Sequence, residues 1–524
     1  MLPGAVAFLL LATVVGGALT ALIITAQGDG ASLLLQDRYI HRVTLFTLFQ
    51  ALLSTLLSAL FAIPVARAFY RRRFVGRAFL LRLFGLCLVV PTIAAILGII
   101  QVHGKSGWVH RLLDMIGVDS GHYLYGLTGI LIAHVFFNMP LMVRGLLNAF
   151  NAIPAESWRL ARQLGMSEWQ AFRLIEWPAL RNSLPGLAGL VLMLCFTSFA
   201  VILTLGGGPK ATTLEVAIYQ SLRFDFDIAR AVALAFIQIV ICGGTAALML
   251  RVGKRTDTEL THATRSQPPA SGSLHSRLFD GTMIAVSLVL VLPPGIAIIL
   301  GGLNSKLSAV LVDPSFHVAV LTSLAVALPA GLLALATGFA ILVTSRHLGL
   351  RLKHRNLGGL LEHSGALILV VPPYVLATGL FVALRSHTDL FSIGPVLVVL
   401  INALMALPFV IRVIGPTYHR LGQEQERLCR SLGMTGWLRL HLVEWPDLRK
   451  PVALALALAV TLSLGDFGVI ALFGSQDFAT LPLYIYRNMG SYRMDQAAVA
   501  ALALIALIFV LFQALERLIG GRNA

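Results

Sequence analysis

The sequence predicts an all-α, polytopic membrane protein with about twelve transmembrane helices. Of its 524 residues, 57% are hydrophobic and only 12% are charged, about half the charged share of a soluble domain. This composition excludes an ordinary soluble enzyme and a disordered chain. Twelve runs are long enough, at about 20 apolar residues, to cross the hydrocarbon core of a bilayer.

The apolar runs form two sets of six. They lie near 4–26, 44–66, 79–102, 124–147, 185–206 and 229–250, and then near 279–302, 318–344, 359–384, 392–414, 451–474 and 496–515. Backbone groups in lipid must be hydrogen-bonded within the chain, so each run is expected to be a helix. The first run has no basic residue before it and exceeds the apolar core of a signal peptide, which predicts an uncleaved span.

One polar segment separates the two sets of runs. It contains Pro268, Pro269 and Gly272, which is typical of a linker. The sequence therefore predicts a first transmembrane domain at 1–251, a cytoplasmic linker at 252–277 and a second transmembrane domain at 278–524.

The distribution of charge predicts the topology. The chain carries 40 Lys and Arg against 24 Asp and Glu, a formal charge of +16. With both termini cytoplasmic, the cytoplasmic segments hold 29 of the 40 cations, as the positive-inside rule requires. The densest basic run, at 66–74, lies between two spans, so we interpret it as a topology marker and expect no nucleic-acid partner.

Two cytoplasmic loops contain a repeat. LARQLGMSEWQAFRLIEWPALRNSL begins at Leu160 and LCRSLGMTGWLRLHLVEWPDLRKPV at Leu428, with twelve of 25 positions identical at an offset of 268. A period this long indicates a duplicated domain. Six spans separate the copies, so both face the same side and the halves are parallel repeats. We call the segments at about 151–184 and 420–450 the docking loops; two identical loops suit a partner that is itself a two-fold dimer.

Each docking loop is expected to form a helix, a turn and a second helix. Gly165 and Gly433 lie where the turn needs a conformation that glycine adopts cheaply. Pro178 and Pro446 suit the first turn of the following helix. The alternative is an amphipathic hairpin on the lipid surface, which does not explain two well-matched copies.

The spacing within each loop carries a family resemblance. In each loop a glycine is followed by nine residues, then by Ile175 or Val443, then by one more residue and Trp-Pro. This spacing is similar to that of the EAA loop of ABC importer permeases. The Glu-Ala-Ala triplet itself is absent, and Trp177 and Trp445 stand where that family usually has Leu. Segments at 67–74, 133–140, 205–222, 462–474 and 480–493 resemble the fused permease of bacterial thiamine importers, so the resemblance covers essentially the whole chain.

The resemblance implies two parallel six-helix repeats of the type I ABC importer permease kind. It further implies a permease subunit that imports thiamine and its phosphates across the bacterial inner membrane. The implied partners are a homodimeric cytoplasmic ATPase, a periplasmic substrate-binding protein and the surrounding membrane lipid. Fused permeases for iron(III) or polyamines remain alternatives, because composition and spacing do not distinguish these substrates.

The chain has no visible ATP site of its own. Its only Gly-Lys-Ser is at 104–106, and Ile99 stands where a P-loop requires glycine. We therefore expect no catalytic residue, cofactor or metal in this chain, with ATP and magnesium bound by the partner ATPase. An ion-coupled secondary transporter is a less favoured alternative, because it would normally place several carboxylates at midmembrane.

The candidate site residues form two groups. The residues expected to contact the ATPase are Gly165, Met166, Trp169, Gly433, Met434 and Trp437, and Glu176 and Glu444 either join them or cap a helix. Asp466 and its repeat counterpart Ser198 are candidates for the substrate pathway, because an intramembrane carboxylate usually faces a cavity or the bundle interior. Alternatively, Asp466 caps a broken helix or pairs with Arg487 or Arg493. His134 and Asn138 are one helical turn apart and favour interhelical hydrogen bonds over a metal site.

Overall fold

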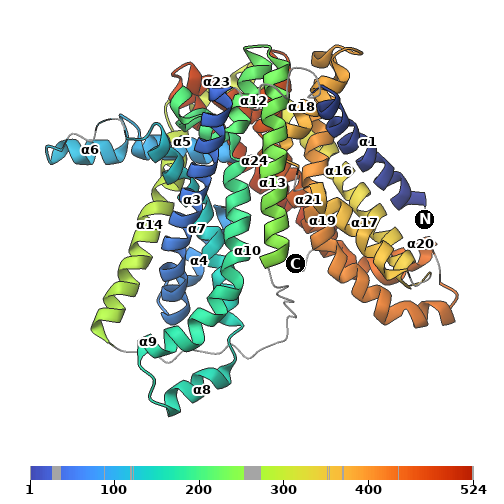
Figure 1. Ribbon diagram of the computed structural model, residues 1–524, viewed down its shortest axis with the longest axis horizontal. Helices are drawn as coiled ribbons and strands as arrows, with labels where there is room; N and C mark the ends of the chain where they lie inside the picture. Colours follow the sequence, from blue (N-terminus) through green and yellow to red (C-terminus); the bar gives the residue numbers. More distant parts are fainter. Residues whose placement is uncertain are drawn as a thin grey trace.

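The computed structural model is built from helices, with no strand among the residues that it describes (Figure 1). It describes the chain apart from residues 1, 26–36, 88, 119–120, 122, 253–272, 351, 353, 369–370, 435 and 522–524. Most of the predicted linker at 252–277 therefore lies outside the described residues. The all-α, polytopic prediction is confirmed.

The described residues of the first half form fourteen helical elements. They are α1 (Leu2–Thr25), α3 (Arg38–Arg71), α4 (Arg77–Leu86), α5 (Thr92–His103), α6 (Trp108–Met115), α7 (Leu127–Asn151), α8 (Ala155–Gln163), α9 (Glu168–Ala171), the π-helical η2 (Phe172–Glu176), α10 (Trp177–Phe196), α11 (Phe199–Leu205), η3 (Pro209–Ala211), α12 (Leu214–Arg223) and α13 (Ile228–Val252).

The second half follows the same order with fewer short helices. Its elements are α14 (Leu274–Gly302), α15 (Leu307–Val312), α16 (Pro314–Leu350), α17 (Arg355–Leu367), α18 (Pro373–Leu384), α19 (Leu390–Ser431), α20 (Gly436–Arg439), the π-helical η5 (Leu440–Glu444), α21 (Trp445–Leu464), α22 (Gly468–Phe473), α23 (Leu481–Gly490) and α24 (Met494–Gly520).

Four of the twelve apolar runs are not continuous helices, which corrects the sequence prediction. Within the described residues, nine helices are long and apolar enough to cross a membrane. The runs at 79–102 and 359–384 are divided into α4 and α5 and into α17 and α18. Pro91 and Pro372 lie at these breaks with extended backbones (ψ 134° and 144°). The third and fourth breaks separate α10 from α11 and α21 from α22.

Equivalent contacts relate the two halves. The Leu214 amide at the start of α12 donates a hydrogen bond to Thr47 Oγ1 of α3 at 3.1 Å, and the Leu481 amide of α23 donates to Ser323 Oγ of α16 at 2.8 Å. The rings of Phe199 and Phe467, which are repeat counterparts, lie 5.7 Å apart. The helix breaks of the two halves therefore meet inside the molecule.

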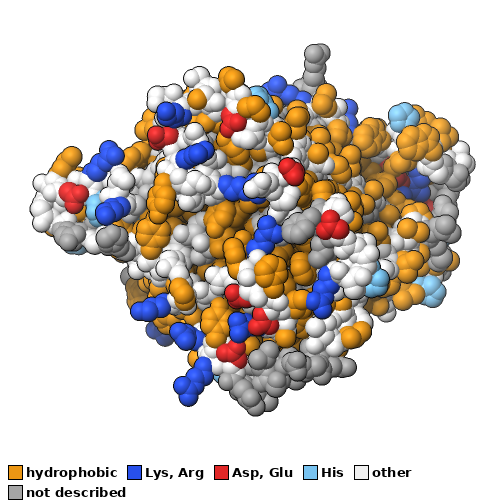
Figure 2. Space-filling view, turned by 90° about the horizontal axis from the view of Figure 1, so that it is seen from above, with side chains coloured by type: hydrophobic (Ala, Val, Ile, Leu, Met, Phe, Trp, Pro, Cys, Tyr) orange, Lys and Arg blue, Asp and Glu red, His pale blue; other side chains and the backbone are white. Residues whose placement is uncertain are grey.

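The two ends of the molecule differ. In Figure 1, α8, α9 and α20 lie at the lower end, and α12 and α23 lie at the upper end. Figure 2 views the upper end, where Lys and Arg side chains and Asp and Glu side chains are scattered among hydrophobic ones. The docking loops therefore lie at the opposite end of the molecule from α12 and α23, the two helices whose first residues are hydrogen-bonded to Thr47 and Ser323.

Candidate functional site: the docking loops and the helix breaks

The first docking loop turns at a left-handed glycine. Gly165 (φ 60°) ends α8, and the loop then enters α9 through a capping box. Ser167 Oγ accepts a hydrogen bond from the Gln170 amide at 3.3 Å, and Gln170 Oε1 accepts one from the Ser167 amide at 2.8 Å. This cap fixes the start of α9, where Trp169 is 68% exposed.

The second docking loop also contains a left-handed glycine at the equivalent position. Gly433 (φ 65°) follows α19, and Gly436 (φ 57°) is the first residue of α20. Gly436 and Leu438 replace Glu168 and Gln170 of the first loop at the repeat offset, so the second loop lacks the side chain that completes the box. Trp437 is nevertheless 76% exposed, as its counterpart is.

A π-helical turn follows in both loops. The Trp177 amide donates to the Phe172 carbonyl, and the Trp445 amide donates to the Leu440 carbonyl, each across five residues. Pro178 next to Trp177 has no N–H, and its ring would clash with the carbonyl four residues earlier in a regular α-helix. A wider turn avoids that clash and is frequent at functional sites.

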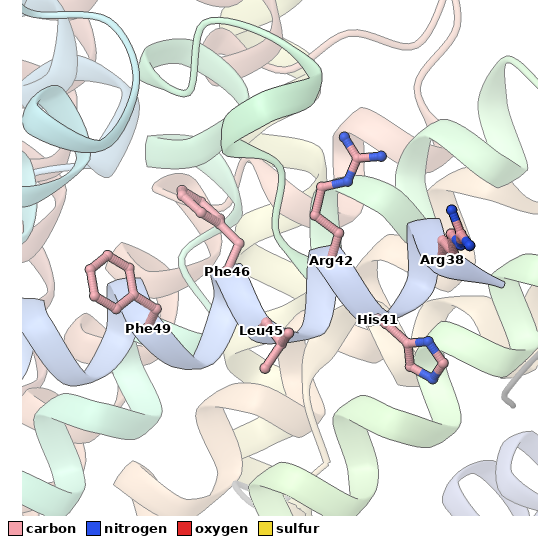
Figure 3. A pocket seen from close by; sticks show the side chains of 6 residues that line it. All are labelled: Arg38, His41, Arg42, Leu45, Phe46 and Phe49. Carbon is pink, nitrogen blue, oxygen red and sulfur yellow. The ribbon is translucent and has the colours of Figure 1, made fainter. Parts of the chain in front are cut away.

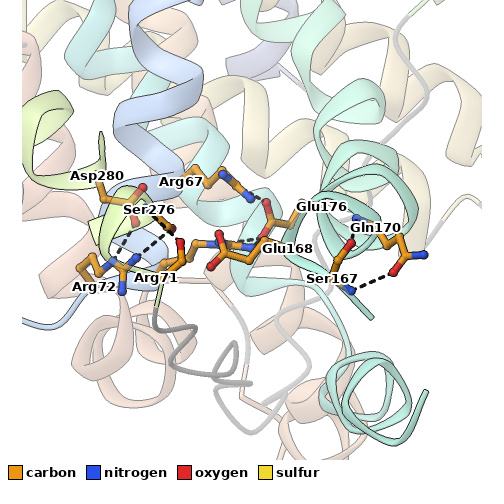
Figure 4. Close-up of polar contacts among 10 residues, drawn as sticks. Arg67, Arg71, Arg72, Ser167, Glu168, Gln170, Glu176, Ser276 and Asp280 are labelled. Atoms are coloured by element: carbon orange, nitrogen blue, oxygen red, sulfur yellow. Dashed lines mark hydrogen bonds and ion pairs between the residues drawn. The ribbon is translucent and has the colours of Figure 1, made fainter. Parts of the chain in front are cut away.

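The π-helical turn buries a glutamate between two arginines of α3 (Figure 4). Glu176 is fully buried, with Oε2 2.5 Å from Arg67 Nε and Oε1 2.8 Å from Arg71 Nη2. Arg71 Nη1 also reaches Glu168 Oε2 at 3.3 Å. The Arg67 guanidinium lies 4.9 Å from the centre of the Phe172 ring. We call Glu176, Arg67 and Arg71 the first clamp.

The second docking loop has an equivalent clamp. Glu444 is 2% exposed, and its Oε1 lies 2.9 Å from Arg346 Nη1 of α16 and 2.7 Å from Arg439 Nε of α20. Arg439 also binds Glu426 at 2.5 Å, and the Arg346 guanidinium lies 3.7 Å from the centre of the Tyr418 ring. Burial alone would lower the pKa of Arg439, but its hydrogen bonds with Glu426 and Glu444 raise that pKa above its usual value. We call Glu444, Arg346 and Arg439 the second clamp.

The clamps correct the expectation for the two glutamates. Neither Glu176 nor Glu444 is exposed for contact with a partner, and neither side chain makes a helix-capping hydrogen bond. The other docking residues lie at the surface: Gly165, Gly433, Trp169 and Trp437 are exposed, and Met166 and Met434 are half-buried.

Sequence reasoning missed the four arginines of the clamps. Arg67 and Arg71 belong to the basic run at 66–74, which we interpreted only as a topology marker. The structure places both on the C-terminal turns of α3, against a loop about one hundred residues later.

Asp466 and Ser198 lie at the breaks of their respective helices. Asp466 Oδ1 accepts a long hydrogen bond, 3.4 Å, from the Val469 amide at the start of α22, and Oδ2 is buried without a hydrogen-bond partner among the described residues. The pairing with Arg487 or Arg493 is not formed. Arg487 Nη2 instead donates to the Ser475 carbonyl at 2.8 Å. One oxygen of Asp466 therefore acts as a local cap, and the other is buried without a hydrogen bond among the described residues.

Ser198 belongs to a buried polar chain. His134 of α7 bridges Ser54 of α3, 2.8 Å from Nδ1, and Ser198, 2.8 Å from Nε2. Asn138 Nδ2 donates to Cys195 Sγ at 3.3 Å. The predicted interhelical hydrogen bonds of His134 and Asn138 are therefore formed, and they connect the break between α10 and α11 to α7 and α3.

Comparison with known proteins agrees with this architecture. Residues 58–258 and 348–522 match the family described as the binding-protein-dependent transport system inner membrane component. The thiamine transport system permease protein ThiP of Escherichia coli is 45% identical over 524 residues, covering 100% of this chain and 97% of the relative. The proteins of the same name from Brucella abortus and Haemophilus influenzae are 44% identical over 522 residues (99% and 95% covered) and 40% identical over 482 residues (91% and 88% covered).

Two segments of the chain match the family, the sequence is 45% identical to a relative over its full length, and the two docking loops are repeated. These observations lead to one assignment. The chain belongs to the family of binding-protein-dependent transport system inner membrane components, as a fused, multi-pass protein of the inner membrane.

Proposed function

We propose that this chain is the permease subunit that forms the translocation pathway for thiamine and its phosphates. The observation that carries the proposal is its identity of 44–45% with several thiamine transport permeases along essentially its whole length. In this proposal a periplasmic binding protein delivers the substrate. A separate homodimeric ATPase binds ATP and magnesium on the cytoplasmic side, where both termini of this chain lie.

The docking loops supply the coupling. Trp169 and Trp437 present large apolar side chains to solvent at equivalent positions, as expected of anchors for a symmetric partner. Gly165, Met166, Gly433 and Met434 form the adjoining surface of the same two loops.

The clamps transmit movement of the loops to the membrane helices. Glu176 fixes the first loop to α3, a helix of 34 residues and about 50 Å. Thr47 of the same helix holds the start of α12 near the opposite end. A displacement of the first loop therefore moves α3 and, through Thr47, the outer part of the bundle. Glu444 and Ser323 play the same roles on α16.

Asp466 and Ser198 line the pathway where the two helix breaks meet. The free Oδ2 of Asp466 supports a role as counter-ion for the positively charged ring of thiamine. Ser198 is neutral at the equivalent position, so the two halves present different chemistry to an asymmetric substrate. Local capping by Oδ1 is compatible with this role, since it occupies only one of the two carboxylate oxygens.

Uptake in cells tests the assignment. The chain is expressed, with its cognate ATPase and binding protein, in bacteria that lack their own thiamine permease and cannot synthesise thiamine. We expect growth on low thiamine and saturable uptake of labelled thiamine that excess thiamine diphosphate inhibits. Uptake of labelled iron(III) or putrescine without uptake of thiamine would overturn the substrate assignment and support the corresponding alternative.

A further inference from the structure

A shallow, open depression, which we call the groove, lies along one side of the N-terminal part of α3, at the end remote from the docking loops. Six side chains line a space of about 530 Å³: Arg38, His41, Arg42, Leu45, Phe46 and Phe49 (Figure 3). The two arginines lie nearest the helix start, and the phenylalanines lie one to three turns further along. The groove is therefore cationic at its outer end and apolar toward the membrane.

The apolar part of the groove continues as a lipid-facing strip. Leu45 is 67% exposed, and Phe49, Leu52 and Leu56 are 54%, 57% and 65% exposed. Their spacing of three or four residues places them on one face of the helix. Positions 38 and 42 extend the same spacing outward, so the arginines lie at the outer end of a face that meets hydrocarbon.

The charges around the two arginines are distributed unevenly. Neither Arg38 nor Arg42 has an ion pair among the residues that the structure describes. The nearby carboxylates of Asp37, Asp225 and Asp227 are instead grouped around Arg230, at 3.7, 3.8 and 3.5 Å. Two guanidiniums at the edge of an apolar face thus have no carboxylate ion-paired to them within the part of the chain that the structure describes.

The second half provides an internal comparison. Thr47 and Ser323 make equivalent hydrogen bonds, which places α3 and α16 at an offset of 276 residues. At that offset Leu321, 65% exposed, matches Leu45, but Pro314 and Val318 stand in place of the two arginines. The apolar strip is therefore common to both halves, whereas the cations belong to one.

We propose that this groove binds one anionic phospholipid, with its headgroup phosphate between Arg38 and Arg42 and an acyl chain along Leu45 and Phe49. Guanidinium groups bind phosphate through two parallel hydrogen bonds. His41 adjoins the headgroup and supplies a further donor. The proposed orientation of the chain places this lipid in the outer leaflet, but the binding itself does not depend on that orientation.

Native mass spectrometry of the purified full chain tests the site. The protein in neutral detergent is titrated with phosphatidylglycerol and, separately, with phosphatidylcholine. We expect one phosphatidylglycerol to bind more tightly than the rest and more tightly than any phosphatidylcholine. The Arg38→Ala/Arg42→Ala variant should bind it about 30-fold more weakly, as expected for the loss of two cations next to an anionic lipid.

Two further variants make the result decisive. Arg38→Lys/Arg42→Lys keeps both charges but loses the paired hydrogen bonds, so its affinity should lie between those of the unchanged protein and the alanine variant. Lys105→Ala/Lys210→Ala removes two exposed cations elsewhere and should leave affinity unchanged. An unchanged Tm of the Arg38→Ala/Arg42→Ala variant without added lipid excludes unfolding as the cause. Equal affinity for phosphatidylglycerol and phosphatidylcholine would overturn the proposal. So would a loss of affinity in Lys105→Ala/Lys210→Ala as large as that in Arg38→Ala/Arg42→Ala.

Discussion

The replacement Glu176→Gln tests the first clamp. It removes the negative charge but keeps the shape of the side chain. Arg71 retains Glu168 at 3.3 Å, whereas Arg67, whose side chain is 18% exposed, loses its only acidic partner among the described residues. The variant therefore leaves a largely buried cation without compensation.

The expected loss follows from this burial. Removing one partner of a buried ion pair costs about 3–5 kcal/mol in the free energy of unfolding. Glutamine keeps one oxygen that accepts a hydrogen bond, so we expect about 3 kcal/mol, the lower end of that range. For a chain of 524 residues the unfolding entropy is about 1.1 kcal/mol/K, so the Tm should fall by roughly 3 °C.

Thermal unfolding in lipid nanodiscs measures the loss. A thiol-reactive dye reports unfolding, because Cys87, Cys195, Cys242 and Cys429 are all free and buried. Glu168→Gln is the matched control, with the same chemical change on a carboxylate that is 32% exposed and 3.3 Å from Arg71. Such a partly exposed pair contributes about 0–1 kcal/mol. Equal Tm values for the two variants would refute the inference that the clamp holds the loop.

Three further predictions concern the exposed loops and the helix break. Trp169→Ala/Trp437→Ala should abolish co-purification with the ATPase while leaving the Tm of the isolated chain within roughly 1 °C, since both side chains are largely exposed. Gly165→Ala should destabilise the chain by about 1 kcal/mol, because the turn has φ 60° and no atom within 4 Å hinders the new methyl group. Asp466→Asn should lower thiamine uptake at least tenfold with normal ATPase assembly, because a charge pair about 4 Å apart is worth on the order of 4 kcal/mol at an effective dielectric constant of about 20 and a tenfold loss needs only about 1.4 kcal/mol.

Each of these predictions has a matched comparison. Trp177→Ala changes a tryptophan that is only 39% exposed and should leave ATPase binding intact. Gly165→Asn should lose less stability than Gly165→Ala, because asparagine adopts the left-handed conformation more readily. Ser198→Ala, at the neutral counterpart of Asp466, should reduce uptake much less. A drop in the Tm of Trp169→Ala/Trp437→Ala as large as that of Glu176→Gln would contradict the first prediction. Equal stability of Gly165→Asn and Gly165→Ala would contradict the second, and unchanged thiamine uptake by Asp466→Asn would contradict the third.

The repeat made the docking loops predictable, but not their anchors. Identical glycines and tryptophans at an offset of 268 indicated two equivalent turns with exposed tryptophans, and both are formed. Glu176 could not be assigned to Arg67 from sequence, because 109 residues separate them and the basic run had a sufficient explanation in topology. In the second clamp, Arg439 has no counterpart in the first loop, where Ala171 stands, so the repeat offered no guide.

The helix breaks were not predictable from proline alone. Pro91 and Pro372 interrupt their apolar runs, yet Pro64, Pro140 and Pro329 lie inside continuous helices. Hydropathy reports only that a segment is apolar, and tertiary contacts decide whether the backbone groups freed by a proline find other partners. Two of the breaks bring the rings of Phe199 and Phe467 within 5.7 Å of each other, next to Ser198 and Asp466, where the proposed function places the pathway.

Transport by the purified complex tests the central claim most directly. The chain, its ATPase and its binding protein are reconstituted in proteoliposomes, and uptake of labelled thiamine is measured with and without ATP on the ATPase side. We predict ATP-dependent uptake that Trp169→Ala/Trp437→Ala abolishes. Accumulation of thiamine by the chain alone, without ATPase or ATP, would contradict coupling through the two docking loops.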